Sequence, residues 1–182
     1  LLEKILKALA LQVGSEVSYN ELAKLCGTDP KTVEKYINIL EKTYIIFKLP
    51  ALSRNIRIEL KKGKKIYFWD NGIRNAIINN FTETISLRND LGAMWENFII
   101  SERMKLHYYH QTNINCYFWR TSQQQEIDFI EEHSSGFKAF EFKWDKPTKA
   151  AFSKTFLFNY HVIETKVITK NNLETFLLEP SF

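Results

Sequence analysis

Hydrophobic side chains recur at helical spacing through the first third of the chain. Apolar residues return every three or four positions over residues 1–13, and Gly14 then interrupts the pattern, which predicts a first helix. A second, shorter helix is expected from Ser18, a capping residue, to Gly27. A cap and an early proline open a third amphipathic stretch over residues 28–43. The chain is therefore expected to begin with three short helices.

Short β-type runs follow these helices. Pro50 and a basic turn separate them, as expected for strands that do not continue into one another. Three helices followed by a β-ribbon is the order of a winged helix-turn-helix module. A short helix over 71–80 and a polar stretch over 82–89 come next, and we place the domain boundary between residues 80 and 81. The β-type runs are residues 44–49, 54–60 and 65–69, and the turn is 61–64.

The second half alternates between helical and strand patterns. A longer helix is expected over 90–110, followed by three successive strands, a helical stretch opened by Pro147, and a further strand. This order predicts an α/β sandwich over residues 81–182, so the whole chain is of the α+β class. The expected strands are 115–120, 125–131, 137–143 and 165–169.

Charge is distributed unevenly between the two halves. The formal net charge is +4, but residues 1–80 hold 14 lysines and arginines against 8 acidic residues, and the remainder is slightly acidic. A basic half favours a polyanionic partner, and clustered carboxylates favour a cation. No apolar stretch is long enough to cross a bilayer, and the start does not have the pattern of a signal peptide. The two distant cysteines indicate neither disulfides nor zinc, so we expect a cytoplasmic protein without a membrane partner.

Acidic and apolar residues alternate in two of the expected strands. In the first, Glu126 and Asp128 share a face, and in the second Glu141 and Lys143 do. Pairing of the two strands would bring Asp128, Glu141 and Lys143 together. Carboxylate oxygens are ligands that Mg²⁺ prefers, and a neighbouring ammonium can orient an attacking water. The alternative interpretation is a solvated strand face with a surface ion pair.

The spacing Asp128-x(12)-Glu141-x-Lys143 resembles the signature of PD-(D/E)XK nucleases, without the proline of that name. The resemblance implies a restriction-endonuclease-like domain that hydrolyses phosphodiesters with Mg²⁺ or Mn²⁺. It also implies that Asp128 and Glu141 bind the metal, that Lys143 assists catalysis, and that Glu96 on the preceding helix is a further catalytic metal ligand. Helical phase leaves Glu102 open as the alternative to Glu96.

A wider set of motifs extends over nearly the whole chain, in segments 19–23, 40–44, 53–55, 67–72, 92–102, 119–122, 126–129 and 141–143. Together these segments resemble a C-terminal domain of bacterial AAA+ ATPases, and the resemblance implies that an ATPase domain is missing from this chain. No GxxxxGK[ST] motif is present, so no ATP hydrolysis is expected from this chain alone.

The basic half presents a candidate nucleic-acid-binding surface. Side chains of the third helix are expected to meet DNA in the major groove, and arginines and lysines of the β-ribbon to follow phosphates; the alternative is a solvated or protein-binding face. The sequence therefore predicts a nuclease or nucleic-acid-binding portion of an AAA+ ATPase. Two alternatives stay open, a catalytically inactive DNA- or protein-binding regulatory module and a dimeric transcriptional regulator. The candidate residues are Lys31, Thr32, Lys35, Asn38, Arg54, Arg57 and Lys61 to Lys65.

Overall fold

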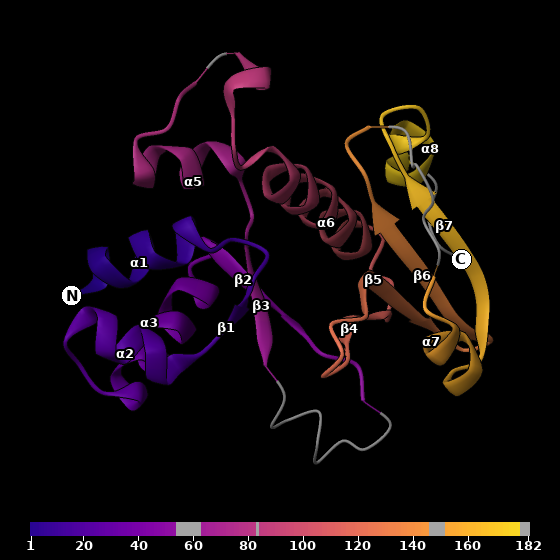
Figure 1. Cartoon of the computed structure of the whole chain (residues 1–182), viewed down its shortest axis with the longest axis horizontal. Helices are drawn as coiled ribbons and strands as arrows, with labels where there is room; N and C mark the ends of the chain where they lie inside the picture. Colours follow the sequence, from indigo (N-terminus) through magenta and orange to yellow (C-terminus); the bar gives the residue numbers. More distant parts are fainter. Residues whose placement is uncertain (54–62, 83, 146–151, 179–182) are drawn as a thin grey trace. The chain divides into compact units, whose positions relative to one another are not determined.

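The computed structural model of the chain has an α+β fold, which confirms the predicted class (Figure 1). It describes residues 1–53, 63–82, 84–145 and 152–178. The chain divides into two compact units: unit 1 comprises Leu1–Leu49 and Gly63–Phe98, and unit 2 comprises Pro50–Lys62 and Ile99–Phe182. The predicted division into residues 1–80 and 81–182 stays a prediction.

Unit 1 combines a small helical cluster with a three-stranded sheet of order β1-β3-β2. The helices α1, α2 and α3 pack on one another, and α5 packs on α1 (Figure 1). Its core is made of side chains such as Ile5, Ile37 and Phe68, which are completely buried. The elements are α1 (Leu2–Leu11), β1 (Glu16–Val17), α2 (Tyr19–Cys26), α3 (Pro30–Lys42), β2 (Ile46–Pro50), β3 (Lys64–Phe68), α5 (Asn71–Ile78) and the 3-10 turn η1 (Ile85–Leu87).

The helix ends of unit 1 follow the capping signals in the sequence. The Ser18 hydroxyl accepts a hydrogen bond from the Glu21 amide at 3.3 Å, and α2 ends at Gly27 in the left-handed conformation. Asp29 caps α3 by accepting from the Thr32 amide at 3.0 Å. The three predicted helices are thus confirmed.

The strands of unit 1 follow the prediction in part. The expected runs 44–49 and 65–69 correspond to β2 and β3, whereas the run 54–60 lies outside the described residues. β1 was not predicted, since two residues show no periodicity, and it is defined by its pairing with Lys64 and Lys65 of β3. The winged-helix arrangement stays a prediction.

Unit 2 is built on a four-stranded sheet of order β4-β5-β6-β7, antiparallel except for the parallel pair β6-β7. The three successive predicted strands are confirmed as β4 to β6. The last strand starts earlier than expected, α8 was not predicted, and the helical stretch expected at Pro147 begins outside the described residues. The elements are α6 (Leu91–Tyr109, which begins in unit 1), β4 (Asn115–Arg120), β5 (Glu126–His133), β6 (Gly136–Phe142), α7 (Lys154–Asn159), β7 (Val162–Ile168) and α8 (Leu173–Leu178).

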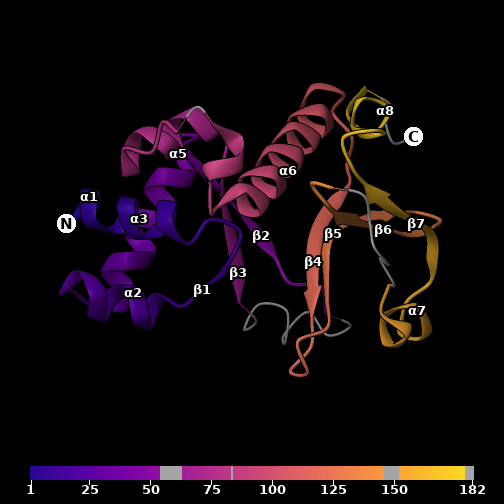
Figure 2. The same ribbon diagram turned by 45° about the horizontal axis from the view of Figure 1, so that its top comes forward.

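Both faces of this sheet are covered. On one face, Ile130 of β5 lies in an apolar cluster with Phe156 of α7 and Leu52. The neighbouring Glu131 points to the opposite face, where Arg103 of α6 contacts it. Figure 2 shows α6 beside β4 and β5. A register shift between β4 and β5 puts Tyr117 opposite Ile130 but Trp119 opposite Ile127, so β5 carries one extra residue there.

None of the helices in the described part of the chain combines the length and hydrophobicity that a membrane span requires.

Candidate functional site

Two of the predicted site acids lie at facing positions where β5 and β6 pair. Phe129 lies opposite Phe140 in this antiparallel ladder, and one further step in the same register puts Asp128 opposite Glu141. The Phe142 amide donates to Asp128 Oδ2 at 2.8 Å, so the Asp128 carboxylate lies against the β6 backbone. Each carboxylate oxygen has two lone pairs, so this hydrogen bond is compatible with a further ligand.

Lys143 follows directly after β6 and lies next to Glu141. Its Nζ is 3.1 Å from Glu141 Oε2, and its side chain is 46% exposed while that of Glu141 is 14% exposed. The Lys143 amide donates to the Ile168 carbonyl of β7 at 2.9 Å, which fixes its backbone. Unit 2 therefore has two carboxylates, Asp128 and Glu141, and the Lys143 ammonium near the start of β5 and the end of β6.

Glu96 has its described partners within unit 1. Its Oε1 accepts hydrogen bonds from Tyr67 Oη at 2.5 Å and from Lys65 Nζ at 3.1 Å. Gly14, with a φ of +75°, adjoins the same carboxylate, and a Cβ there would stand 3.4 Å from Glu96 Oε1. These contacts anchor the start of α6 to β3, and the metal-binding role of Glu96 stays a prediction.

Glu102, the alternative to Glu96, has a different neighbour. Its Oε1 lies 2.6 Å from Lys105 Nζ one turn further along α6, and its side chain is 37% exposed. This is the geometry of an exposed i,i+3 helix pair.

The donor set fits Mg²⁺ better than it fits a transition metal. Within the described residues, no group of three or more His, Cys, Asp and Glu side chains is arranged to hold a metal ion. Asp128 and Glu141 supply two carboxylates, and Mg²⁺ is commonly held by one or two carboxylates together with waters and substrate phosphates. Two carboxylates are within the number that such sites use, and the Mg²⁺ site stays a prediction.

A buried charged cluster in unit 2 was not predicted. Glu131 is fully buried on β5, and Arg103 Nε and His107 Nε2 of α6 lie 2.6 and 2.8 Å from its Oε1. His133 Nε2 lies 3.3 Å from Oε2. The sequence held one signal, because Glu131 is in phase with the core residue Phe129 two positions earlier.

The electrostatics of this cluster favour the ionised carboxylate. Burial by itself would raise the pKa of Glu131, but the hydrogen bond with His107 and the charge and hydrogen bonds of Arg103 lower that pKa to about 2. Burial and the charge of Glu131 raise the pKa of the Cys116 thiol well above its ordinary value. Glu131 therefore joins β5 to α6 through buried charged contacts.

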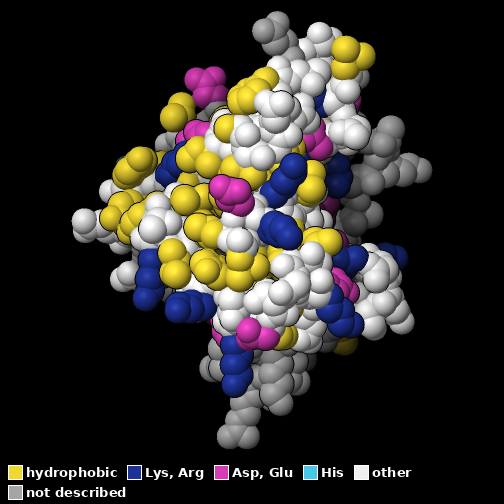
Figure 3. Space-filling view, turned by 90° about the vertical axis from the view of Figure 1, so that its left-hand side faces the viewer, with side chains coloured by type: hydrophobic (Ala, Val, Ile, Leu, Met, Phe, Trp, Pro, Cys, Tyr) yellow, Lys and Arg dark blue, Asp and Glu magenta, His cyan; other side chains and the backbone are white. Residues whose placement is uncertain are grey.

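The candidate nucleic-acid-binding residues of α3 differ in their surroundings. Lys31 and Lys35 are exposed and line a shallow hollow of about 360 Å³. Thr32 Oγ1 donates to Asp29 Oδ2 at 2.7 Å, and Asn38 Oδ1 accepts from Lys48 Nζ at 2.6 Å, so these two side chains have structural partners. On the face seen in Figure 3, lysines and arginines are interspersed with hydrophobic and acidic side chains.

The β-ribbon part of the predicted interface is only partly described. Arg54, Arg57, Lys61 and Lys62 lie outside the described residues. Lys65 is 3% exposed and bound to Glu96, so the prediction that it follows phosphates is wrong. Its side chain lies on the same face of β3 as Tyr67, which contacts the same Glu96 carboxylate.

Asn97 is a further residue whose role the sequence did not reveal. It is completely buried in unit 1 and makes both backbone hydrogen bonds of Phe68: its Oδ1 accepts from the amide at 2.8 Å, and its Nδ2 donates to the carbonyl at 3.0 Å. Nδ2 also donates to Asn71 Oδ1 at 2.7 Å. The side chain thus completes the hydrogen bonding at the end of β3.

Comparisons with known proteins match both halves of the chain. Residues 1–84 match a family described as Domain of unknown function (DUF8612), and residues 91–179 match Domain of unknown function (DUF4143). No solved structure matches significantly. The chain is 29% identical over 136 residues to Uncharacterized protein Mb2031c of Mycobacterium bovis and to Uncharacterized protein Rv2008c of Mycobacterium tuberculosis. These alignments cover 74% of this chain and 30% of each relative, so the chain is similar to a part of two longer proteins.

Proposed function

We propose that this chain is the nucleic-acid-processing portion of an AAA+ ATPase, with a Mg²⁺-dependent nuclease site in unit 2. The observation that carries the proposal is the meeting of Asp128 with Glu141 across β5 and β6, with Lys143 Nζ 3.1 Å from Glu141. Two acids and a lysine at adjoining strand ends supply the donors that metal-assisted phosphodiester hydrolysis needs.

Each of the three residues has a distinct task in this proposal. Asp128 and Glu141 would hold Mg²⁺ or Mn²⁺, and the bound ion would supply an activated water and stabilise charge at the phosphate. The hydrogen bond from the Phe142 amide holds the Asp128 carboxylate against the β6 backbone, one residue from Glu141. Lys143, half exposed beside Glu141, is placed to orient the water or to contact the phosphate.

The rest of the chain supports nucleic-acid binding and attachment to an ATPase. The matched region 91–179 is a domain found in AAA-ATPase-associated proteins, and both relatives are more than three times as long as the region they share with this chain. Lys31 and Lys35 on α3 would contact phosphates, together with Arg54 and Arg57. We place this activity in the cytoplasm, with DNA as the substrate.

The experiment that tests the nuclease site is a calorimetric titration with Mn²⁺ followed by plasmid nicking in Mg²⁺. Asp128→Asn should lose metal binding and nicking, because an amide keeps the acceptor for the Phe142 amide but removes the charge. Glu174→Gln, an exposed acid on α8, is the matched control and should behave as wild type. Nicking by Asp128→Asn at the wild-type rate would refute the assignment.

The second candidate function is a catalytically inactive binding module of the same ATPase. It is favoured by the contacts of Glu96, whose carboxylate is engaged by Tyr67 and Lys65, and by the presence of two rather than three carboxylates at the site among the residues described. This module would bind DNA without binding metal. Salt-dependent DNA binding that Lys31→Glu with Lys35→Glu weakens, with no heat of Mn²⁺ binding, would identify it.

A further inference from the structure

A cavity lies at the carboxyl ends of the parallel strands β6 and β7. Its volume is about 430 Å³, and its lining is Trp144, Asp145, Thr169, Lys170 and Asn171. The two chain segments that form it are joined by the hydrogen bond from the Lys143 amide to the Ile168 carbonyl. The carboxyl ends of parallel strands are a common place for ligands, and a cavity of this size is in the range of small-molecule sites.

The side chains that line the cavity are of the kinds that bind an aromatic heterocycle. Trp144 is half-buried, and Lys170 Nζ lies 4.4 Å from the centroid of its ring. The same ammonium is 3.3 Å from Asp145 Oδ1, so its positive charge is offset. An indole surface, an amide, a hydroxyl and a neutralised ion pair suit an uncharged ring with hydrogen-bonding edges better than they suit a bare anion.

The segment that carries Lys170 and Asn171 is held in place before any ligand binds. Asn172 Oδ1 accepts from the Thr169 amide at 2.8 Å, and its Nδ2 donates to the Val167 carbonyl at 2.8 Å. The Asn171 amide donates to Thr169 Oγ1 at 3.3 Å. These bonds preorganise the turn, which lowers the entropy that a ligand must overcome.

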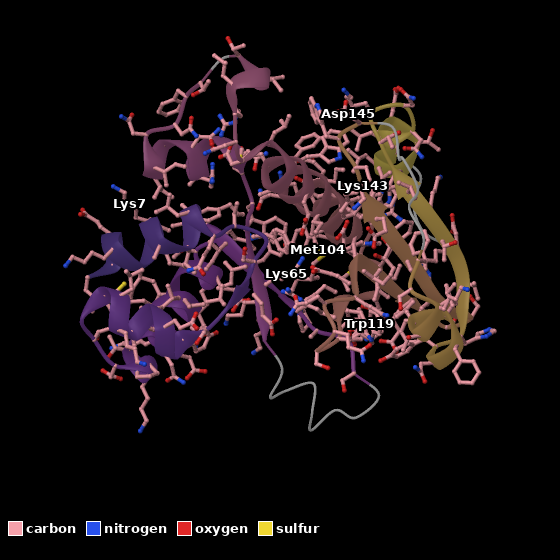
Figure 4. All side chains as sticks on the ribbon, in the orientation of Figure 1. Lys7, Lys65, Met104, Trp119, Lys143 and Asp145 are labelled. Carbon is pink, nitrogen blue, oxygen red and sulfur yellow. The ribbon has the colours of Figure 1, made fainter. Side chains whose placement is uncertain are left out.

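The cavity adjoins the proposed nuclease site along the chain. Trp144 is the residue after Lys143, and Figure 4 shows Lys143 and Asp145 at the same end of β6. Consecutive Cα atoms are about 3.8 Å apart, so Lys143 and Trp144 start from adjoining backbone positions. This adjacency is the reason for placing the base at Trp144 next to a phosphate at Lys143.

We infer that this cavity binds a base of a single-stranded nucleic acid, stacked on Trp144 and hydrogen-bonded by Asn171 and Asp145, next to the phosphate at Lys143. The inference rests on the proposed function for its orientation, but the binding of the base itself requires no metal. It implies that the nucleic acid is single-stranded at this position, because in a duplex the faces of a base are covered by the stacked neighbouring bases.

The test measures binding of a fluorescein-labelled eight-nucleotide oligothymidylate to the full chain in EDTA. Trp144→Ala should weaken binding about 5- to 150-fold, as expected for the loss of one base stack, and Trp144→Phe should keep most of the affinity. Trp69→Phe in unit 1 is the matched control and should bind as wild type. Asn171→Ala, an exposed side chain, gives a second variant should Trp144→Ala fail to fold.

The choice of probe separates the possible ligands. An abasic octamer has the same phosphates, so it should bind with similar affinity to wild type and Trp144→Ala. Thymidine monophosphate should bind far more weakly than the octamer. The inference is overturned if Trp144→Ala and Asn171→Ala bind the oligothymidylate as wild type does, or if the mononucleotide binds as tightly as the octamer.

Failure here is distinguishable from failure of the nuclease site. Binding in EDTA that depends on Trp144, with cleavage of neither the oligothymidylate nor the plasmid in Mg²⁺, would refute the nuclease and leave the base site standing. Nicking that requires Asp128, with oligothymidylate binding that ignores Trp144 and Asn171, would refute the base site alone.

Discussion

Arg103 and Glu131 form a buried, two-point ion pair in unit 2. Arg103 Nε and one terminal nitrogen donate to the two Glu131 oxygens at 2.6 and 3.2 Å, and both side chains are at most 4% exposed. The same guanidinium donates to the Phe176 carbonyl at 2.6 Å and lies 4.6 Å from the centroid of the Phe176 ring. One arginine thus ties α6 to both β5 and α8.

Removing the charge of Glu131 should destabilise the protein strongly. In Glu131→Gln, Arg103 becomes a buried charge without a compensating anion, which costs about 3 to 5 kcal/mol of unfolding free energy. Urea denaturation measures this loss. Glu132→Gln, on the adjacent and half-exposed position of the same strand, should cost about 1 kcal/mol or less. Similar losses for the two variants would contradict a special role for the pair.

The depressed pKa of Glu131 predicts how stability depends on pH. Its pKa falls from 4.5 to about 2 on folding, so the unfolded chain binds the proton more readily than the folded one. The stabilisation is therefore complete above about pH 4.5 and is lost as the pH falls toward 2. A shift of this size corresponds to about 3 kcal/mol. The free energies of unfolding of wild type and Glu131→Gln are compared between pH 7 and pH 2.5. Their difference should be constant above pH 5 and become smaller below it. A difference that stays constant down to pH 2.5 would refute the lowered pKa.

Asn97→Leu should destabilise unit 1 although leucine has nearly the same size. The Phe68 amide and carbonyl would lose their partners in a buried place, and each unsatisfied group costs about 1 to 3 kcal/mol. Asn113→Leu, at an exposed position, is the control. Hydrogen exchange at the Phe68 amide should accelerate in Asn97→Leu, and unchanged protection there would argue against this hydrogen bond.

Two neighbouring lysines of β3 should respond differently to substitution. Lys65→Ala removes the buried ammonium that pairs with the partly buried Glu96 carboxylate, so we expect a loss of about 2 to 3 kcal/mol. Lys64→Ala, at a half-exposed position, should change stability by about 0.5 kcal/mol. Thermal denaturation and DNA binding, measured on the same variant, distinguish a structural role of Lys65 from a role in binding phosphates. Lys65→Met should lower the stability of the protein without changing the salt dependence of DNA binding. A reduced salt dependence in Lys65→Met would show that Lys65 meets phosphates after all.

Local sequence signals predicted most of the elements. Ser18, Gly27 and Asp29 mark the ends of α2 and α3 because capping involves side chains and amides two or three residues apart. Alternation predicted β4 to β6 in the same way. β1 and α8 were not predicted, because two strand residues or six helical residues contain too few periods for a hydrophobic pattern to be recognised.

The candidate site was partly predictable for the same reason. Asp128 and Glu141 belong to successive strands of a hairpin, so alternation and a short turn sufficed to propose that they meet. Glu96 was proposed from the family resemblance, and its contacts with Lys65 and Tyr67 had no local signal.

The sequence by itself determined where helices and strands begin and which side chains share a strand face, because these properties depend on neighbours within a few residues. Only the tertiary structure decided that Arg103 pairs with Glu131, that Lys65 turns inward to Glu96, and that Asn97 completes β3. These partners are 28 to 31 residues apart in sequence. A charged or amide side chain at such a distance looks solvent-exposed until packing removes water from it, and its partner is then chosen by which group the fold brings within hydrogen-bonding distance.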